Sequence, residues 1–464
     1  MASERSKKSK AETIEALRTA GVVGCGGAGF PTYAKFSGGA PEHFIVNAAE
    51  CEPLLRTDRY VMRHHAAEVV SAVGEIAETV GAEHTTIALK EGYREEIAAL
   101  ERAIGAAGRG ITLHLMKSFY PAGDEQTMVF EVTGRVVPPG GIPLDVSCVV
   151  SNVATMLAAR EALDGRPFTH RYLTVSGEVQ KPVIAGVPIG TPLASCLAAA
   201  GGSNLPDYCV LIGGPMMGRI MSKEEFENLY TTKTTAGIVV LPLPSRLEAV
   251  QRMTDRQMAT RARAACIRCS MCTDLCPRNL LGHPLEPHRI MRSLALCGSL
   301  EALSLDDPVT RSAALCCECG ICELIACPME LQPRRVNAEL RKRLAAAGIR
   351  YEKGTGQRVP SRLLGARKVP TGRAAARTGV YRYNKIQIDE LATLTPSRVV
   401  IPFAQHIGAP CAPIAKSGER VSLGQVVAAS PADKLGSVLH ASIAGVVEVM
   451  EDAIAITAEG GEKR

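Results

Sequence analysis

The chain has 464 residues and a net charge of +6; 46% of its residues are hydrophobic, but only 4% are aromatic and none is tryptophan. A chain of this length forms about three or four domains, whose cores must rest on Ala, Val, Leu and Ile. No apolar run approaches the roughly 20 residues that span a bilayer, and the first ten residues lack the apolar stretch of a signal peptide. We therefore predict a multidomain cytoplasmic protein with no transmembrane segment, in which the 16 cysteines are reduced thiols rather than disulfides.

A glycine-rich loop follows the first predicted helix, residues 10–20. It reads Gly24-Cys25-Gly26-Gly27-Ala28-Gly29-Phe30-Pro31-Thr32 and fits the pattern G-x-G-x-x-G. A Rossmann fingerprint needs a strand directly before this loop, and only Val22 and Val23 are available for one. Glycines nevertheless let backbone N–H groups approach a phosphate or a flat ring closely. We interpret the segment as a cofactor loop, with a plain turn as the alternative.

Polar residues gather in three later segments. Asn47, Glu50 and Glu52 follow the predicted strand 44–46, at the strand end where ligands bind in α/β folds. A loop at 120–126 and the start of a predicted helix near residue 152 supply the other polar candidates, which are Tyr120, Gly123, Asp124, Glu125, Asn152 and Thr155.

Together these segments resemble the FMN- and NADH-binding 51 kDa subunit of respiratory complex I and, still more, the RnfC component of the Rnf electron-transport complex. The resemblance implies a Rossmann-like domain over residues 1–168 that binds FMN and NADH. FMN would be held by the glycine loop, Lys35, Asn47, Glu50 and Asn152, and NADH would stack near Phe30 and contact Glu52 and Glu125. Tyr120, Gly123, Asp124 and Thr155 complete the predicted cofactor site.

Two departures from the complex I pattern affect individual flavin contacts. That pattern has an arginine where Cys25 stands and an acidic residue where Ala49 stands. The alternative to a flavin site is a domain that keeps the fold but has lost its nucleotide. We expect no catalytic acid or base, because hydride transfer does not require one.

Residues 169–245 show predicted strands around a short helix near 192–200. This arrangement indicates a β-grasp module, and the resemblance implies a soluble-ligand-binding β-grasp domain. We expect Met216 and Met217 to pack in the protein rather than to bind a ligand.

Two cysteine runs follow, each a triplet at i, i+3 and i+6 with a fourth cysteine just before a proline. They consist of Cys266, Cys269, Cys272 and Cys276, and of Cys316, Cys319, Cys322 and Cys327. In two-cluster ferredoxins the fourth cysteine of each run ligates the other cluster. We therefore predict a helical ferredoxin-like domain over 246–345, with one [4Fe–4S] cluster on Cys266, Cys269, Cys272 and Cys327 and a second on Cys316, Cys319, Cys322 and Cys276. Structural zinc is the alternative, but it uses two cysteine pairs rather than two triplets.

Fifteen Lys or Arg residues and only two Glu lie between residues 334 and 385, a local charge of +13. Glycines and prolines interrupt this segment, so we interpret residues 346–392 as a basic linker over the surface. An anionic partner is the alternative. Because no aromatic residues interleave the charges in the manner of a nucleic-acid groove, we expect no nucleic-acid partner.

Residues 393–464 contain short β runs broken by glycines, typical of a barrel-sandwich hybrid of the lipoyl type. Asp433-Lys434 at the predicted hairpin suggests a lipoyl-lysine as an alternative, but few acidic residues surround it. In the RnfC component the matching domain lies at the amino terminus. The permuted order, the length and the sequence Gly123-Asp124-Glu125-Gln126 resemble the cobalamin reductases of propanediol-utilisation bacterial microcompartments.

This resemblance implies an NADH:acceptor oxidoreductase of mixed α/β and α+β fold. Electrons would pass from NADH to FMN, to two [4Fe–4S] clusters and to a corrinoid, because a flavin converts a hydride into single electrons. It also implies a place inside a microcompartment, with an adenosyltransferase and shell proteins as candidate partners. Two alternatives remain: an NADH-oxidising RnfC-type subunit of an Rnf-like electron-transport complex, and a non-catalytic iron–sulfur electron carrier. The sequence has no corrinoid-binding D-x-H-x-x-G motif, so it does not identify the terminal acceptor.

Overall fold

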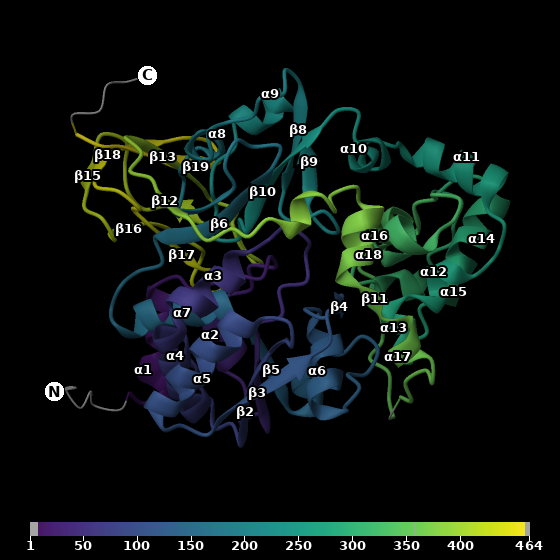
Figure 1. Ribbon diagram of the computed structural model, residues 1–464, viewed down its shortest axis with the longest axis horizontal. Helices are drawn as coiled ribbons and strands as arrows, with labels where there is room; N and C mark the ends of the chain where they lie inside the picture. The colour runs from purple at the N-terminus through teal and green to yellow at the C-terminus, as the bar shows by residue number, and fades with distance from the viewer. Residues whose placement is uncertain (1–7, 357, 460–464) are drawn as a thin grey trace.

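A parallel four-stranded sheet organises the amino-terminal part of the protein (Figure 1). The computed structural model describes residues 8–356 and 358–459. The sheet has the order β3-β2-β1-β5 and consists of β1 (His43–Asn47), β2 (His84–Lys90), β3 (Ile111–Met116) and β5 (Cys148–Asn152). Its helices are α1 (Lys10–Thr19), α2 (Thr32–Phe36), α3 (Thr57–His64), α4 (Ala66–Val80), α5 (Arg94–Ala107), α6 (Glu125–Thr133) and α7 (Val153–Leu163).

Both faces of this sheet are covered, as the apolar strands require. Phe44 and Val46 of β1 pack into a core with α1, α4, α5 and α7, whereas Ile45 packs into the opposite core with α6. Alternate residues of a strand point to opposite faces, so a continuous apolar run fits a doubly covered parallel strand. The chain departs in opposite directions from β1 and β5, and Asn47 pairs with Asn152 in the register of these two strands. This is the switch point at which ligands bind in open α/β sheets.

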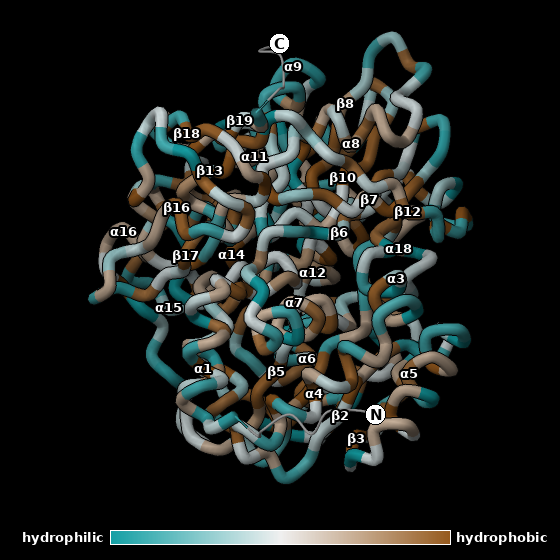
Figure 2. Tube along the Cα trace, turned by 90° about the vertical axis from the view of Figure 1, so that its left-hand side faces the viewer, coloured by the Kyte–Doolittle hydropathy of each residue, from teal (hydrophilic) through white to brown (hydrophobic). Residues whose placement is uncertain are grey.

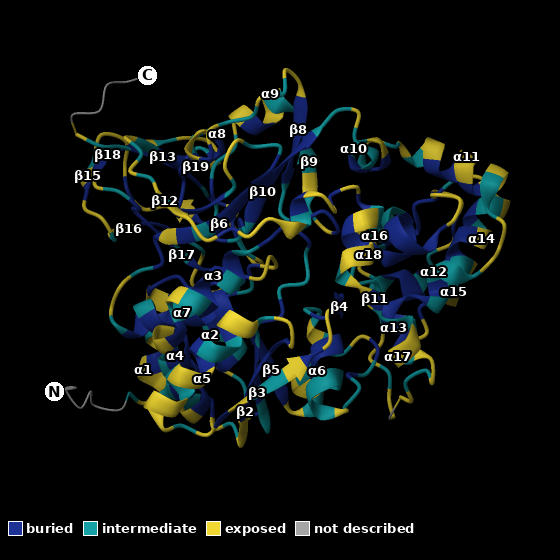
Figure 3. Cartoon of the chain, in the orientation of Figure 1, coloured by how far each residue is buried: buried dark blue, intermediate teal, exposed yellow. Residues whose placement is uncertain are grey.

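The second unit is a six-stranded mixed sheet with the order β12-β7-β6-β10-β8-β9. Its strands are β6 (His170–Gly177), β7 (Val183–Pro188), β8 (Tyr208–Ile212), β9 (Arg219–Met221), β10 (Gly237–Pro242) and β12 (Leu391–Thr393). Helices α8 (Leu193–Ala199) and α9 (Lys223–Glu227) bury Leu193, Leu197 and Phe226 against it. Figure 2 shows hydrophobic residues gathered along β7, β8 and β10, and Figure 3 shows β8 and β10 mostly buried.

The cysteine-rich unit is helical and lies at the far side of the molecule from the amino-terminal sheet (Figure 1). It contains α10 (Arg246–Gln251), α11 (Asp255–Ala265), α12 (Met271–Asp274), α13 (Pro277–Leu280), α14 (Pro287–Cys297), α15 (Pro308–Arg311), η2 (Ser312–Leu315), the π-helical η3 (Ile321–Ala326) and α16 (Pro333–Ala346). Proline is the first residue of α13 and of α16, a position where its missing N–H costs no hydrogen bond.

The segment that we expected to be a surface linker, residues 346–392, is partly buried in the structure. It contains α17 (Leu364–Arg367), β11 (Val369–Pro370), α18 (Thr371–Arg377) and η4 (Tyr383–Lys385), and β11 pairs with β4 (Phe119–Tyr120). Ala374, Ala375 and Val380 have no exposed surface. The high charge hid these small apolar residues, which pack inward while arginines between them remain outside. At its end, β12 adds an edge strand to the six-stranded sheet.

The carboxyl-terminal unit is a pair of antiparallel sheets with the orders β13-β19-β18-β15 and β14-β16-β17. The strands are β13 (Arg398–Pro402), β14 (Ala412–Pro413), β15 (Arg420–Val421), β16 (Val426–Ala429), β17 (Val438–His440), β18 (Gly445–Val449) and β19 (Ala453–Thr457). Among residues 8–356 and 358–459, no helix has both the length and the apolar character needed to cross a membrane.

Candidate functional site

The glycine loop is closed at its base and open at its tip. Val23 and Pro31 form an isolated β-bridge, and the N–H of Gly24 donates to the carbonyl of Phe30 at 2.8 Å. Gly26, Gly27 and Ala28 are exposed, and their N–H groups donate to no residue that the structure describes. Gly27 has a φ of 108°, a conformation that favours glycine. Free N–H groups on such a loop form a place where an anion can bind.

This loop lies over the switch point of the sheet. The N–H of Cys25 donates to Oγ1 of Thr155 at 2.8 Å, and a Cβ on Gly26 would lie 3.4 Å from the Cβ of Asn152. Asn152 caps α7 through Oδ1, and its Nδ2 donates to Asp58 at 2.8 Å. The structure therefore brings the loop and Asn152 together, although an isolated bridge rather than a strand precedes the loop.

The other predicted flavin residues surround the same strand ends. Nδ2 of Asn47 donates to the carbonyl of Gly123 at 2.9 Å, which joins the loop after β1 to the loop after β4. A side chain on Gly123 would lie 3.2 Å from the carbonyl of Ala49, so this close approach favours glycine. Nζ of Lys35 donates to Glu125 at 2.7 Å and to the carbonyl of Val150 at 2.8 Å.

Two half-buried carboxylates line the same edge. Burial, with Asp58 and Glu52 nearby, raises the pKa of Glu50 to about 8, and burial raises the pKa of Glu52 to about 7. Oε2 of Glu52 accepts from the N–H of Met216 at 2.9 Å, whereas its Oε1 is buried and has no partner in the described chain. Met216 is 1% exposed and lies in a core, whereas Met217 is 54% exposed. An unpartnered buried oxygen is costly unless a ligand donates to it.

These observations fit a flavin mononucleotide and a nicotinamide nucleotide. The free N–H groups of the loop suit a phosphate, Asn47 and Asn152 supply amides at the switch point, and Oε1 of Glu52 lacks a donor.

Two of the predicted cofactor residues instead join the flavin domain to the cysteine-rich domain. Both carboxylate oxygens of Asp124 accept from Arg278, at 2.6 and 2.8 Å. Burial alone would raise the pKa of Asp124, but the Arg278 guanidinium holds that pKa below its usual value. The hydroxyl of Tyr120 donates to the carbonyl of Cys319 at 2.7 Å and is buried. Any cofactor contact of these two residues stays a prediction.

The predicted cluster cysteines line two separate cavities. Cys266, Cys269, Cys272 and Cys327 surround one, and Cys276, Cys316, Cys319 and Cys322 surround the other. Burial and the three neighbouring thiols raise the pKa of Cys272 to about 12, and burial raises that of Cys276 to about 12. Four thiols around one cavity fit a [4Fe–4S] cluster, whose iron binds and deprotonates them. Cys317, outside the spacing, also lines the second cavity.

Both cysteine triplets have the same backbone conformation. The residues two and four positions after the first cysteine are left-handed in each, with φ of 57° at Arg268 and Ser270, 56° at Glu318 and 78° at Gly320. Three of these four are not glycine, so the conformation carries strain. The repeated turns direct the three thiols of each triplet towards one cavity.

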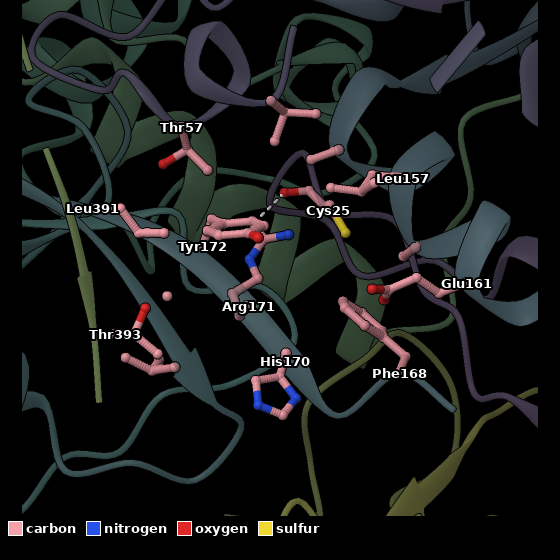
Figure 4. A pocket seen from close by; sticks show the side chains of 15 residues that line it. Cys25, Thr57, Leu157, Glu161, Phe168, His170, Arg171, Tyr172, Leu391 and Thr393 are labelled. Atoms are coloured by element: carbon pink, nitrogen blue, oxygen red, sulfur yellow. Dashed lines mark hydrogen bonds between the residues drawn. The ribbon is translucent and has the colours of Figure 1, made fainter. Parts of the chain in front are cut away.

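A further cavity of about 140 Å³ lies behind the glycine loop, between α7 and β6 (Figure 4). Cys25, Glu161, Arg171 and Tyr172 are among its lining residues, and none of the predicted cofactor residues is. Arg171 is 5% exposed and donates to the carbonyls of Cys25 at 2.8 Å and Thr235 at 3.0 Å. Sequence analysis missed Arg171, Arg278 and the Met216 N–H, because each partner lies more than 140 residues away and no motif marks the pairing.

Curated relatives match almost the whole chain. It is 40% identical to the cobalamin reductase PduS of Salmonella typhimurium over 450 residues, and 38% identical to that of Citrobacter freundii over 451; each match covers 96% of both chains. The chain belongs to the PduS cobalamin reductase family.

Family models match the parts of this reductase separately. The Nuo51 FMN-binding domain matches residues 17–161, the SLBB domain 172–220, the 4Fe-4S dicluster domain 265–332 and the RnfC barrel sandwich hybrid domain 382–462. The chain is also 35% identical to an RnfC-type component of the ion-translocating oxidoreductase complex of Erwinia tasmaniensis over 280 residues, 60% of this chain and 33% of that one. The chain thus carries an FMN-binding domain and a domain for two [4Fe–4S] clusters, as the sequence analysis predicted.

Proposed function

We propose that the protein is an NADH-dependent flavo-iron–sulfur reductase that delivers electrons to a corrinoid. The observation that carries this proposal is the pair of four-thiol cavities, which Tyr120 and Asp124 join directly to the flavin domain. Bound FMN would accept a hydride from NADH and release single electrons that iron–sulfur clusters can carry. Family membership agrees with this reaction, because the relatives are named cobalamin reductases.

The chain's own residues would bind and orient the two nucleotides. We propose that the N–H groups of Gly26, Gly27 and Ala28, with Lys35, Asn47, Glu50 and Asn152, hold FMN. Oε1 of Glu52 is then available to accept from a ribose hydroxyl of NADH, and the carboxylate would repel the 2′-phosphate of NADPH. Phe30 is half-buried beside the loop, where a nucleotide ring can stack on it.

The two cavities differ in their distance from solvent. Cys276, Cys319 and Cys322 are buried, and the carbonyl of Cys319 contacts Tyr120 of the flavin domain. Cys269 of the other cavity is exposed, with Cys266 and Cys272 half-buried. We propose that the buried set holds the cluster on the flavin side, and that the more exposed set faces the corrinoid.

The proposal extends to the organisation and the surroundings of the chain. We propose domains at 1–168, 169–245, 246–345 and 393–464, with residues 346–392 packed between the last two. We also propose that the protein works inside a microcompartment beside an adenosyltransferase and shell proteins. The resemblance to the propanediol-utilisation reductases is the support for this last point.

Anaerobic spectroscopy tests the electron path. The purified protein, with FMN and iron quantified, is mixed with NADH and then with cob(III)alamin. We expect NADH to bleach the visible absorbance of the clusters, and cob(III)alamin to restore it. Clusters that dithionite bleaches but NADH does not would contradict the reductase and would favour a passive electron carrier. Bleaching by NADH without reoxidation by the corrinoid would favour a component of an Rnf-like complex, to which the shared region with the Erwinia protein points.

A further inference from the structure

Asn337 is a buried amide that faces one of the two thiol-lined cavities. It lies in the first turns of α16, is 1% exposed, and lines the cavity of Cys276, Cys316, Cys319 and Cys322. Neither its Nδ2 nor its Oδ1 has a hydrogen-bond partner in the described chain. A buried amide without partners is unfavourable, so this donor requires an acceptor that the polypeptide does not supply.

The other cavity has no equivalent group. Of the polar side chains that line it, Ser270 already donates to the carbonyl of Cys269 at 2.8 Å, and Nδ1 of His288 shares a hydrogen bond with Thr273 at 2.8 Å. Arg268 is exposed. Two sites with the same thiol spacing and the same left-handed turns therefore differ in one buried donor.

We propose that Asn337 donates a hydrogen bond to a sulfur of the [4Fe–4S] cluster at Cys276, Cys316, Cys319 and Cys322, and that it thereby raises the reduction potential of that cluster alone. One added electron makes the cluster more negative, so a donor to its sulfur stabilises the reduced form more than the oxidised form. Asn337 is in this sense a tuning residue and not a cluster ligand. The inference rests on the cluster assignment made under the proposed function.

Chemistry around the amide agrees with this role. Arg334, one turn from Asn337, lines the same cavity, but its guanidinium already donates to the carbonyl of Met216 at 2.9 Å and pairs with Glu323 at 3.3 Å. The amide is therefore the polar side chain of this wall whose hydrogen-bonding capacity is unused. Its neighbour Cys316 is one of the four thiols, and the Asn337 side chain favours the thiolate form of Cys316.

The test is a dithionite titration of the full-length, cluster-loaded protein followed by electron paramagnetic resonance. We expect Asn337→Leu to keep both clusters and to lower one midpoint potential. At the wild-type midpoint, the ratio of reduced to oxidised cluster should fall about tenfold, which is about 59 mV for a one-electron couple. The second cluster should titrate unchanged. Asn337→Asp, which has the same shape but replaces the donor with a negative charge, should lower the same midpoint further.

Gln332→Leu is the matched control. Gln332 precedes α16, is 1% exposed and has an unpartnered Oε1, but it lines neither cavity. It should change stability and neither potential. Unshifted midpoints in both Asn337 variants, or equal shifts of both clusters, would overturn the inference. If the leucine variant loses iron, the aspartate variant decides; loss of the cluster from both would make Asn337 an assembly residue and also overturn it. A wild-type protein without two clusters would instead overturn the proposed function.

Discussion

Glu52 shows how one side chain can serve two domains. Its Oε2 is bound by the Met216 N–H, and its Oε1 has no partner among the described residues. We predict that Glu52→Gln raises KM for NADH about tenfold or more, because a hydrogen bond to a charged group contributes about 1.5–3 kcal/mol. FMN content and dithionite reduction of the clusters should not change. Steady-state kinetics with NADH and NADPH measures this; an unchanged KM and unchanged discrimination between the two would show that Glu52 only ties two loops together.

Glu50 and Glu52 also make stability depend on pH. Burial raises their pKa values to about 8 and about 7, above the ordinary value of 4.5. The folded chain then binds protons more tightly than the unfolded chain, so the stabilisation is fully present below pH 4.5 and is lost as the pH rises through 7 to 8. We predict that the melting temperature of the cofactor-free protein falls from about pH 5 to about pH 8, and that Glu50→Gln flattens this fall. Equal slopes for the two proteins would contradict the assignment.

At the scale of elements, the amino end of α6 and the start of α13 join two domains. Asp124 caps α6 by accepting from the N–H of Thr127, and it pairs with Arg278 just after Cys276-Pro277. Both side chains are about 90% buried. We predict that Asp124→Asn, which keeps a cap, lowers the free energy of unfolding by about 3–5 kcal/mol, because Arg278 is left as a buried unpaired charge.

The same variant should slow the reduction of the clusters by NADH more than a flavin-only reaction with ferricyanide. Denaturant unfolding and stopped-flow absorbance measure the two effects. Asp306→Asn is the control, since its pair with Arg311 is largely exposed and should contribute about 1 kcal/mol or less. Equal effects of the two substitutions would contradict a role for the buried pair.

The elements also show how far sequence reasoning reaches. Cysteine spacing predicts which four thiols share a cavity because it is a local pattern that a loop of fixed length enforces. Periodic apolar runs likewise predict β1 and its neighbours. The pairing of Glu52 with Met216, and of Asp124 with Arg278, depends on how domains dock, and no local pattern encodes it. The buried part of residues 346–392 was missed for the opposite reason, since average charge concealed the alanines of α18.

Across the whole molecule, three domains meet behind the glycine loop. The N–H of Ile407 from the carboxyl-terminal barrel donates to the carbonyl of Gly29 at 3.1 Å. Arg171 of the six-stranded sheet holds the carbonyl of Cys25. Nζ of Lys233 donates to the carbonyls of Gly21 and Val438, both at 2.7 Å. A domain that stands at the amino terminus of RnfC components can therefore support the same loop from the carboxyl end, since the contacts depend on space and not on chain order.

Lys233 is the best single position at which to test this junction. It is 1% exposed, and burial lowers its pKa to about 7, so the folded protein favours a neutral amine whose two N–H groups match the two carbonyls. We predict that Lys233→Met leaves both carbonyls buried without a donor and lowers the free energy of unfolding by about 2–4 kcal/mol. Because Gly21 leads into the glycine loop, the affinity for FMN should fall while the iron content stays the same. Flavin fluorescence titration and iron analysis measure these effects. Lys181→Met, at an exposed lysine paired with Glu390, is the control and should alter neither. If Lys233→Met destabilises the protein but binds FMN as tightly as the wild type, the three-domain junction does not position the flavin loop.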